Sequence, residues 1–404
     1  MYKLSKTNRT VYLASLFLYN FARVLPHAIL TVILLNKGLT VSQIAIVQSF
    51  YMLAAIMFEF PSGFLTDIWS EKIMYQLSLV LIGISYFIIL FTNNYYLLCL
   101  SWFIYGMSAA SMSGSLDSYF IRRAENKHEI KGINVLINRS TLYSGLIGGG
   151  LGSFLYEILS EQIYILSLLL IISSFILITF GFHAENSEEN NEMTSSESFK
   201  KIITELKNIK YQNKLIIIIG LYGIFQIISQ LFYQFWQVSF LDKEFSKTYF
   251  GLLYVLFQIV AIFSNALFSR HNFSNSLIPL TITLSGALLI SIFTPNKILF
   301  LIFIIIFLVP FNVYNNQLIV NIQKESDSNI VASVISLAGT VSSIISMIVL
   351  WIIGILNNYF EFWFVEVVLI AIFIILSLFL LILYSYQKSW IRLVLPFLSK
   401  FSKR

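Results

Sequence analysis

Long apolar runs, separated by short polar breaks, make up most of this 404-residue sequence. A helix needs about 20 apolar residues to cross the hydrocarbon core of a bilayer, and the runs recur at that length. The pattern predicts twelve membrane-spanning helices, at 11–35, 42–66, 72–92, 95–119, 133–158, 160–182, 214–240, 248–268, 275–294, 297–321, 330–356 and 361–386. The expected fold class is therefore an all-α polytopic membrane protein.

One polar stretch, 184–213, is much longer than the other breaks and divides the predicted helices into six and six. It starts acidic and rich in Ser and Asn, and then turns basic. We expect an N-terminal six-helix bundle at 1–183, a cytoplasmic linker at 184–213 with a short surface helix near 197–210, and a C-terminal six-helix bundle at 214–387. A basic amphipathic tail at 388–404 is expected to lie on the cytoplasmic membrane surface.

Composition and charge exclude a water-soluble fold. Hydrophobic residues make up 57% of the chain and charged residues 11%, against about 25% charged residues in a typical soluble protein. With the N-terminus in the cytoplasm, 20 of the 26 Lys and Arg residues fall on the cytoplasmic side of the membrane. This bias predicts that both termini lie in the cytoplasm. The same bias accounts for the net charge of +6 without a nucleic-acid partner. Ile, Asn, Lys and Phe are abundant, as is typical of an AT-rich bacterial genome, so we expect a bacterial plasma-membrane protein.

The sequence carries no pattern typical of an enzyme, a metal site or a bound cofactor. Cys99 is the only cysteine and the four His residues are scattered, which excludes a disulfide framework within the chain and a thiolate metal site. No Gly-x-x-x-x-Gly-Lys-Ser/Thr run is present, which argues against an ATP-driven pump. No oligomerisation motif stands out, and we expect a monomer that needs no cofactor.

The link after the second predicted span carries a motif that runs from Gly63 to Lys72, Gly-Phe-Leu-Thr-Asp-Ile-Trp-Ser-Glu-Lys. It resembles the loop signature of the major facilitator superfamily, Gly-x-Leu-x-Asp-Arg-x-Gly-Arg-Lys. The residues that match are Gly63, Leu65, Asp67 and Lys72, and those that depart are Ile68, Ser70 and Glu71. The six-plus-six division and the cytoplasmic tails extend the resemblance to the whole chain. The resemblance implies two six-helix bundles that transport by alternating access.

In the resembled family, this loop helps to latch the outward-facing state. Carried over, the resemblance gives a latch role to Gly63, Asp67 and Lys72, together with Arg139 of the fifth span. The simpler alternative is that Asp67 only solvates a tight turn. The fifth span also has many glycines at 145–152, and these allow either close, sliding helix contacts or ordinary small-residue packing.

Polar side chains follow one face of the first, fourth, seventh and tenth predicted spans. Residues three or four apart share a helix face, and in the resembled superfamily these four spans line the central cavity. The candidate substrate-binding residues are Asn20, Arg23, His27, Tyr105, Gln226, Gln230, Gln234, Asn312 and Asn316. The alternative for the amides is that they hydrogen-bond between helices.

Arg23 is the most informative of these residues, because a charged group inside a bilayer is costly and is functional by default. It either binds an anionic group of the substrate or pairs with a carboxylate. His27, one turn later, could titrate near neutral pH or serve only in packing.

Two acidic residues within the spans are candidates for proton coupling. Glu59 lies two turns before Asp67 and is the first candidate, and Asp117, at the end of the fourth span, is the second. Asp117 and Arg139 are expected near the same membrane face, so an ion pair between them is the structural alternative.

These features predict a secondary active transporter that moves a small molecule across the cytoplasmic membrane. We expect proton-coupled export of an amphipathic compound or drug, because the aromatic residues on the cavity helices suit a bulky, partly apolar substrate. Two alternatives stay open: an importer of an organic anion or nutrient, and a non-transporting membrane receptor or lipid-handling scaffold.

Overall fold

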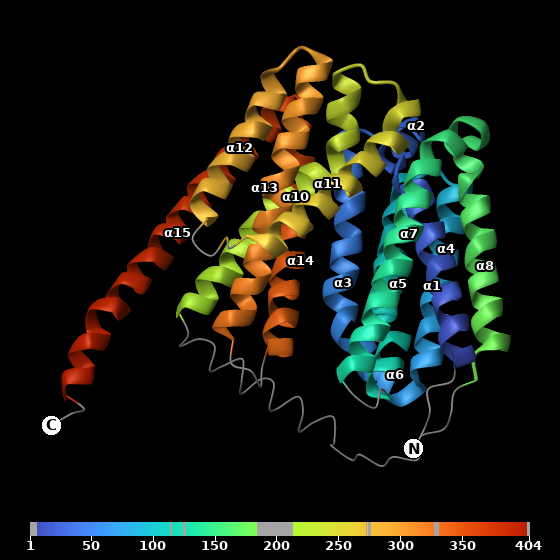
Figure 1. Ribbon diagram of the computed structural model, residues 1–404. Coiled ribbons are helices and arrows are strands. Elements are labelled where there is room, and N and C mark those ends of the chain that lie inside the picture. Colours follow the sequence, from blue (N-terminus) through green and yellow to red (C-terminus); the bar gives the residue numbers. More distant parts are fainter. Residues whose placement is uncertain are drawn as a thin grey trace. The chain divides into compact units, whose positions relative to one another are not determined.

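The computed structural model describes residues 6–113, 115–123, 127–183, 213–271, 273, 276–326 and 331–401. Across these residues the secondary structure is helical, without strands (Figure 1). The predicted surface helix near 197–210 and nearly all of the linker lie outside the described residues.

The first half of the chain forms the six spans predicted for it, and two of these spans are broken. The bounds are α1 Lys6–His27, α2 Leu30–Asn36, α3 Val41–Trp69, α4 Glu71–Phe91, α5 Tyr95–Met112, α6 Leu116–Arg122, α7 Lys127–Leu159, η1 Ser160–Gln162 and α8 Ile163–Gly181. The breaks fall between α1 and α2 and between α5 and α6.

The described part of the second half forms six α-helices. Their bounds, with one short 3-10 turn, are α10 Asn213–Asp242, η2 Lys247–Tyr249, α11 Phe250–Arg270, α12 Leu277–Phe293, α13 Lys297–Glu325, α14 Val331–Leu356 and α15 Phe362–Phe401. The last helix continues through most of the predicted tail, whose side chains lie outside the described residues.

Each of the twelve predicted spans coincides with a helix or a pair of helices. By length and composition alone, nine helices in the described part are long and apolar enough to cross a membrane, or ten with the bent α1–α2 pair. That count takes Gly132–Gly181, which holds two predicted spans, as one segment. It also leaves out α12, which is apolar but has only 17 residues.

Residues with special backbone or capping properties set several helix ends. The side chains of Asn94 and Asn296 accept hydrogen bonds from the first N–H groups of α5 and α13, which stabilises a helix start. Pro26 lies near the end of α1, and the chain bends by 51° between α1 and α2, as proline inside a helix predicts. Ser70, between α3 and α4, has a φ of 98°, a conformation that favours glycine.

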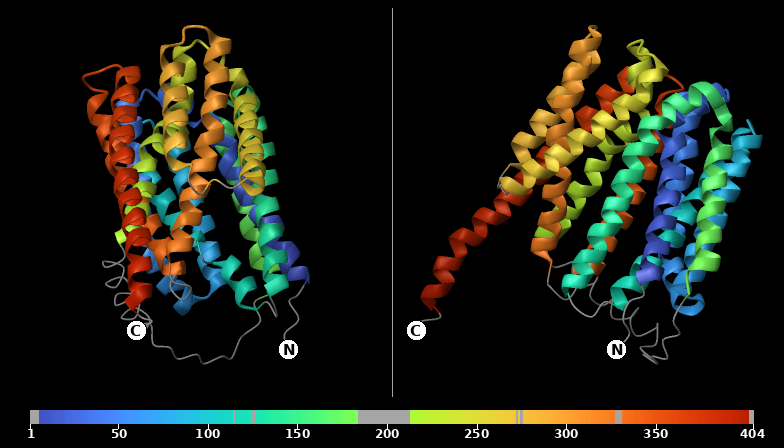
Figure 2. Two further views of the ribbon diagram at one scale, coloured as in Figure 1. Left: turned by 60° about the vertical axis from the view of Figure 1, so that its left-hand side comes forward. Right: turned by 45° about the vertical axis from the view of Figure 1, so that its right-hand side comes forward.

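The helices group into two compact units that do not coincide with the two halves of the sequence. The first unit contains 1–191, 234–258 and 350–359, and the second unit contains 192–233, 259–349 and 360–404. Within the first unit, α1 packs against α7 and α8 (Figure 2). In the same unit, α5 packs against α3 and α4. The six-plus-six division of the working bundles stays a prediction.

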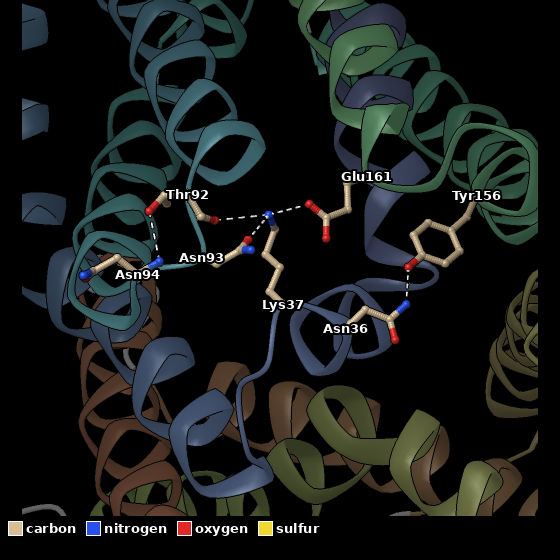
Figure 3. A network of polar contacts seen from close by, with 7 residues as sticks. All are labelled: Asn36, Lys37, Thr92, Asn93, Asn94, Tyr156 and Glu161. Carbon is tan, nitrogen blue, oxygen red and sulfur yellow. Dashed lines mark hydrogen bonds and ion pairs between the residues drawn. The ribbon is translucent and has the colours of Figure 1, made fainter.

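A buried lysine ties α2 to its neighbours in the first unit (Figure 3). Lys37 follows α2 and is only 6% exposed. Its Nζ contacts the Thr92 carbonyl oxygen at 3.1 Å, Asn93 Oδ1 at 3.1 Å and Glu161 Oε2 at 2.6 Å. The preceding residue, Asn36, donates to the Tyr156 hydroxyl at 2.6 Å. All these partners come from first-half helices or their links, so the network holds α2 in place on them.

Candidate functional site

Arg23 lies on α1 among tyrosines from four helices. Its guanidinium lies 5.8 Å from the centre of the Tyr19 ring, one turn earlier on the same helix. It also interacts electrostatically with the phenol groups of Tyr51 on α3, Tyr86 on α4 and Tyr105 on α5. Tyr105 packs edge-on against Tyr51 and Tyr86, with ring centres 5.2 and 6.0 Å apart. We call these five residues the Arg23–tyrosine site.

Close contact between α3 and α5 brings two of these tyrosines together. A Cβ added at Gly106 would lie 2.7 Å from the Cβ of Ala54 and would also overlap the Tyr51 carbonyl group. Only glycine therefore permits this approach. Tyr105, the residue before Gly106, is thereby held against Tyr51.

Among the described residues, no acidic side chain compensates the charge of Arg23. Arginine stays protonated in proteins, so the charge persists. Two buried donors also lack a partner: the hydroxyl of Tyr19, and Nε2 of Gln48, which lies one turn before Tyr51 on α3. Gln48 is oriented by Trp102, whose Nε1 donates to Gln48 Oε1 at 3.1 Å. The site thus presents, within the described residues, a positive charge without a carboxylate partner and two unused donors.

The other two candidates on α1 differ in their environment. Asn20 is buried, and its amide donates to Thr141 Oγ1 on α7 at 3.3 Å. His27 is exposed at the end of α1. Asn20 therefore connects two helices, whereas the imidazole of His27 is accessible.

In the second unit, the candidate amides take part in local hydrogen bonds. Gln230 is buried and donates to Ser346 Oγ on α14 at 3.0 Å. Asn316 donates to Asn265 Oδ1 on α11 at 2.6 Å. Both contacts match the alternative expectation, in which amides join helices.

The remaining amide candidates are half-buried. Asn312 donates to the Leu308 carbonyl oxygen of its own helix at 2.7 Å. Gln226 and Gln234 lie on α10. A single cavity shared by all nine candidates stays a prediction, since they are divided between the two units.

Gln237, one turn after Gln234 on α10, contacts the break between α1 and α2. Its Nε2 donates to the Ala28 carbonyl oxygen at 3.0 Å, and its Oε1 accepts from the Val32 N–H at 3.2 Å. Thr31 donates to the Gln234 carbonyl oxygen at 2.9 Å. The end of α10 therefore satisfies backbone groups that the break between α1 and α2 leaves without helical partners.

Two more second-half helices contact first-half helices at the same end, through residues that also belong to the first unit. Gly251 at the start of α11 donates its N–H to Ser153 Oγ on α7 at 2.8 Å. An added Cβ at Gly251 would lie 2.6 Å from both the Gly150 carbonyl oxygen and Ser153 Oγ. On α14, Trp351 Nε1 donates to Ser49 Oγ on α3 at 2.8 Å. We call these contacts, with those of Gln237, the α2-end contact.

Glu59 and Asp117, the proton-coupling candidates, have different surroundings. Glu59 is exposed on α3. Asp117 is half-buried on α6 and accepts a hydrogen bond from the Tyr12 hydroxyl of α1. The predicted Asp117–Arg139 ion pair is wrong: Arg139 is exposed on α7 and forms no ion pair within the described part of the chain. The Asp117 carboxylate instead accepts a hydrogen bond from the Tyr12 hydroxyl.

The latch candidates are described only in part. Gly63 and Asp67 lie in the last turns of α3, and their side chains are outside the described residues. Lys72 donates to the carbonyl oxygens of Thr179 at 3.1 Å and Phe182 at 2.7 Å, at the end of α8. A lysine there stabilises the helix C-terminus, so Lys72 links the start of α4 to the end of α8.

The residue types that depart from the loop motif have structural consequences. Glu71 pairs with Arg123 at 3.7 Å, a contact that the usual arginine at this position would not allow. Ser70 occupies the motif's second glycine position with a φ of 98°. A non-glycine residue in this conformation is strained.

Most of the Arg23–tyrosine site was missed at the level of sequence. Tyr19, Tyr51 and Tyr86 were not among the candidates, and only Tyr105 was. The spacing of Tyr19 and Arg23, four apart on one helix, was a usable signal. The positions of Tyr51 and Tyr86 depend on how α3 and α4 pack, and no local pattern indicates it.

Comparisons with known proteins agree with the fold. The family model described as Major Facilitator Superfamily matches residues 12–350. A protein of Bacillus subtilis (strain 168), described as "Uncharacterized MFS-type transporter YxaM", is 24% identical over 232 residues. That match covers 57% of this chain and 58% of the relative, so the aligned part spans little more than half of the relative's length.

Three solved structures show the same fold over nearly their full length. A bacterial homologue of the human lysosomal transporter Spinster, inward-facing and occupied, has a TM-score of 0.77 at 11% identity and covers 95% of this chain and 98% of its own. The nucleoside transporter NupG has a TM-score of 0.73 at 13% identity, and the match covers 94% of this chain and 98% of NupG. The D-xylose-proton symporter has a TM-score of 0.72 at 11% identity, and the match covers 93% of this chain and 96% of the symporter.

Proposed function

Since this chain belongs to the major facilitator superfamily, we propose that it exports an amphipathic small molecule by alternating access in exchange for protons. Membership of this family indicates that the chain is a transporter and not an enzyme. The observation that carries the proposal is the α2-end contact, because a transporter needs a closure that can form and break.

The composition of the α2-end contact suits a reversible closure. It joins helix ends at Gly251 and Ser153 and through the hydrogen bonds of Gln237 and Trp351. Small residues allow helices to approach and separate without dismantling a large apolar core. In the expected orientation this end faces outward, so its closure leaves the substrate path accessible only from the cytoplasm.

Proton exchange requires a carboxylate that can be protonated from the aqueous phase. Glu59 is exposed, and no ion pair holds it within the described residues. Asp117 is held by the Tyr12 hydroxyl, which makes it the less accessible of the two. Glu59 is therefore the group that we propose for coupling.

The experiment that tests the proposal is transport by the full chain in proteoliposomes with an imposed pH gradient. A panel of anionic, neutral and cationic amphipathic compounds is offered, and an internal pH dye reports proton movement. We expect at least one compound to move against the proton flux, and to move faster than in protein-free liposomes. Movement in the same direction as protons would contradict export by exchange and favour the importer alternative.

A further inference from the structure

We propose that the Arg23–tyrosine site binds the negatively charged group of an organic anion whose aromatic body packs on the tyrosine rings. The inference rests on the proposed function, because it names the substrate class of the same transporter. Three properties of the site support it: the charge of Arg23, the unused hydrogen-bond donors and the aromatic surface.

The charge of Arg23 points to an anionic ligand. The residue lies near the middle of the bent α1–α2 pair, and no carboxylate pairs with it among the described residues. A guanidinium inside a bilayer is normally paired or functional. Its planar donor group binds carboxylate or phosphate oxygens in a bidentate manner, so a ligand with such a group would supply the missing partner.

Unused hydrogen-bond donors support the same conclusion. Tyr19 is 2% exposed, lies beside Arg23, and its hydroxyl has no partner among the residues that the structure describes. Burying a hydroxyl without a partner is costly. An anion bound to Arg23 would accept from this hydroxyl, which explains why a tyrosine rather than a phenylalanine occupies the position.

The aromatic surface defines the rest of the ligand. Tyr51 and Tyr105 are half-buried and contact each other edge-on at 5.2 Å. Aromatic faces favour a planar, apolar body over an extended polar one. A cationic compound with the same body would be repelled by Arg23. The predicted order of affinity is therefore acid above amide, with the amine weakest.

The test compares three probes that share one aromatic body: 1-naphthaleneacetate, 1-naphthaleneacetamide and 1-naphthylethylamine. Binding to the purified full chain in zwitterionic nanodiscs is measured by calorimetry and by the shift in melting temperature. We expect the acid to bind about tenfold or more tightly than the amide, since hydrogen bonds to charged groups are the stronger ones.

Variants assign the effect to the site. Arg23→Ala should abolish the preference for the acid, and Arg23→Lys should restore part of it. Tyr19→Phe should weaken binding of the acid several-fold without lowering the melting temperature, because the hydroxyl has no partner in the free protein. A structural role for this hydroxyl would instead lower the melting temperature. Arg270→Ala, which removes an exposed arginine at the end of α11, is the matched control and should change nothing.

Several results would overturn the inference. Equal affinity for acid and amide, no binding of the acid, or an unchanged preference in both Arg23 variants would each do so. A second set of nanodiscs with phosphatidylglycerol distinguishes a lipid headgroup from a soluble anion. Loss of acid binding in these nanodiscs would assign the site to lipid and overturn the substrate assignment.

Failure of this inference is distinguishable from failure of the proposed function. Charge preference is measured as binding and requires no transport. The pH-gradient experiment, in contrast, uses compounds of all three charge classes. If only a neutral or cationic compound were transported, the proposed transport function would be supported and the proposed anion-binding site would be excluded.

Discussion

Gly251 allows a quantitative test of the α2-end contact. Replacing Gly251 with Ala would place a Cβ 2.6 Å from the Gly150 carbonyl oxygen and from Ser153 Oγ, where ordinary contact begins at 3.4 Å. The helices would have to separate by about 0.8 Å. Overpacking of this kind costs about 1–3 kcal/mol. Because the cost arises only when this end is closed, the closed population should fall by about 5- to 150-fold relative to the open one.

The assay is maleimide labelling of a cysteine that the closed end buries. Cys99→Ala first removes the only native cysteine. Ser49→Cys then places a thiol at a position that is 1% exposed and contacts Trp351 of α14. Labelling requires opening of this end, so its rate in the Gly251→Ala protein should rise about tenfold or more.

Gly145→Ala is the matched control for this substitution. Gly145 lies on α7, and an added Cβ there meets no atom within 4 Å. The change from glycine to alanine in a helix is itself favourable by up to about 1 kcal/mol, so this variant should fold at least as well and label at the original rate. Equal labelling rates in the two variants would refute the reasoning that close packing at Gly251 controls the opening.

Three further predictions concern the fold and the coupling residue. Ser70→Gly should raise the free energy of unfolding by about 1 kcal/mol, since it relieves a residue held at a φ of 98°; an unchanged chemical-denaturation midpoint would argue against strain. Lys37→Met should lower the free energy of unfolding by about 1–3 kcal/mol. The loss is smaller than for a fully buried ion pair because the Glu161 side chain is 33% exposed. A lower melting temperature would confirm the loss, and an unchanged one would mean that the Lys37 network does not stabilise the fold. Glu59→Gln should remove the dependence of transport on the pH gradient while binding persists, and a retained dependence would exclude Glu59 as the coupling group.

The sequence was sufficient for the spans because membrane crossing imposes a length and a composition that local windows reveal. Even the irregular points had local causes: Pro26 marks the break after α1, and Asn94 and Asn296 mark helix starts. The resemblance seen in one loop motif extends to a family model that covers residues 12–350.

The site was predictable only in part, because polar residues were assigned by helix face without knowledge of packing. Arg23 was identified by its rarity, whereas the tyrosines around it are common residues brought together by α3, α4 and α5. Gln230 and Asn316 lie on the polar faces that were predicted to bind substrate, but each donates a hydrogen bond to a side chain of a neighbouring helix. The Asp117–Arg139 pair failed for the same reason, since proximity to one membrane face does not determine which side chains meet.

Counterflow of a substrate is the measurement that tests alternating access most directly. Proteoliposomes are loaded with an excess of an unlabelled compound from the transported set, and a labelled tracer of the same compound is added outside without any ion gradient. Alternating access predicts a transient accumulation of tracer inside above its external concentration, and a reduced accumulation rate in the Gly251→Ala protein. Tracer that equilibrates without overshoot would indicate a channel, and tracer that only binds would indicate a receptor or scaffold; either result would contradict the account.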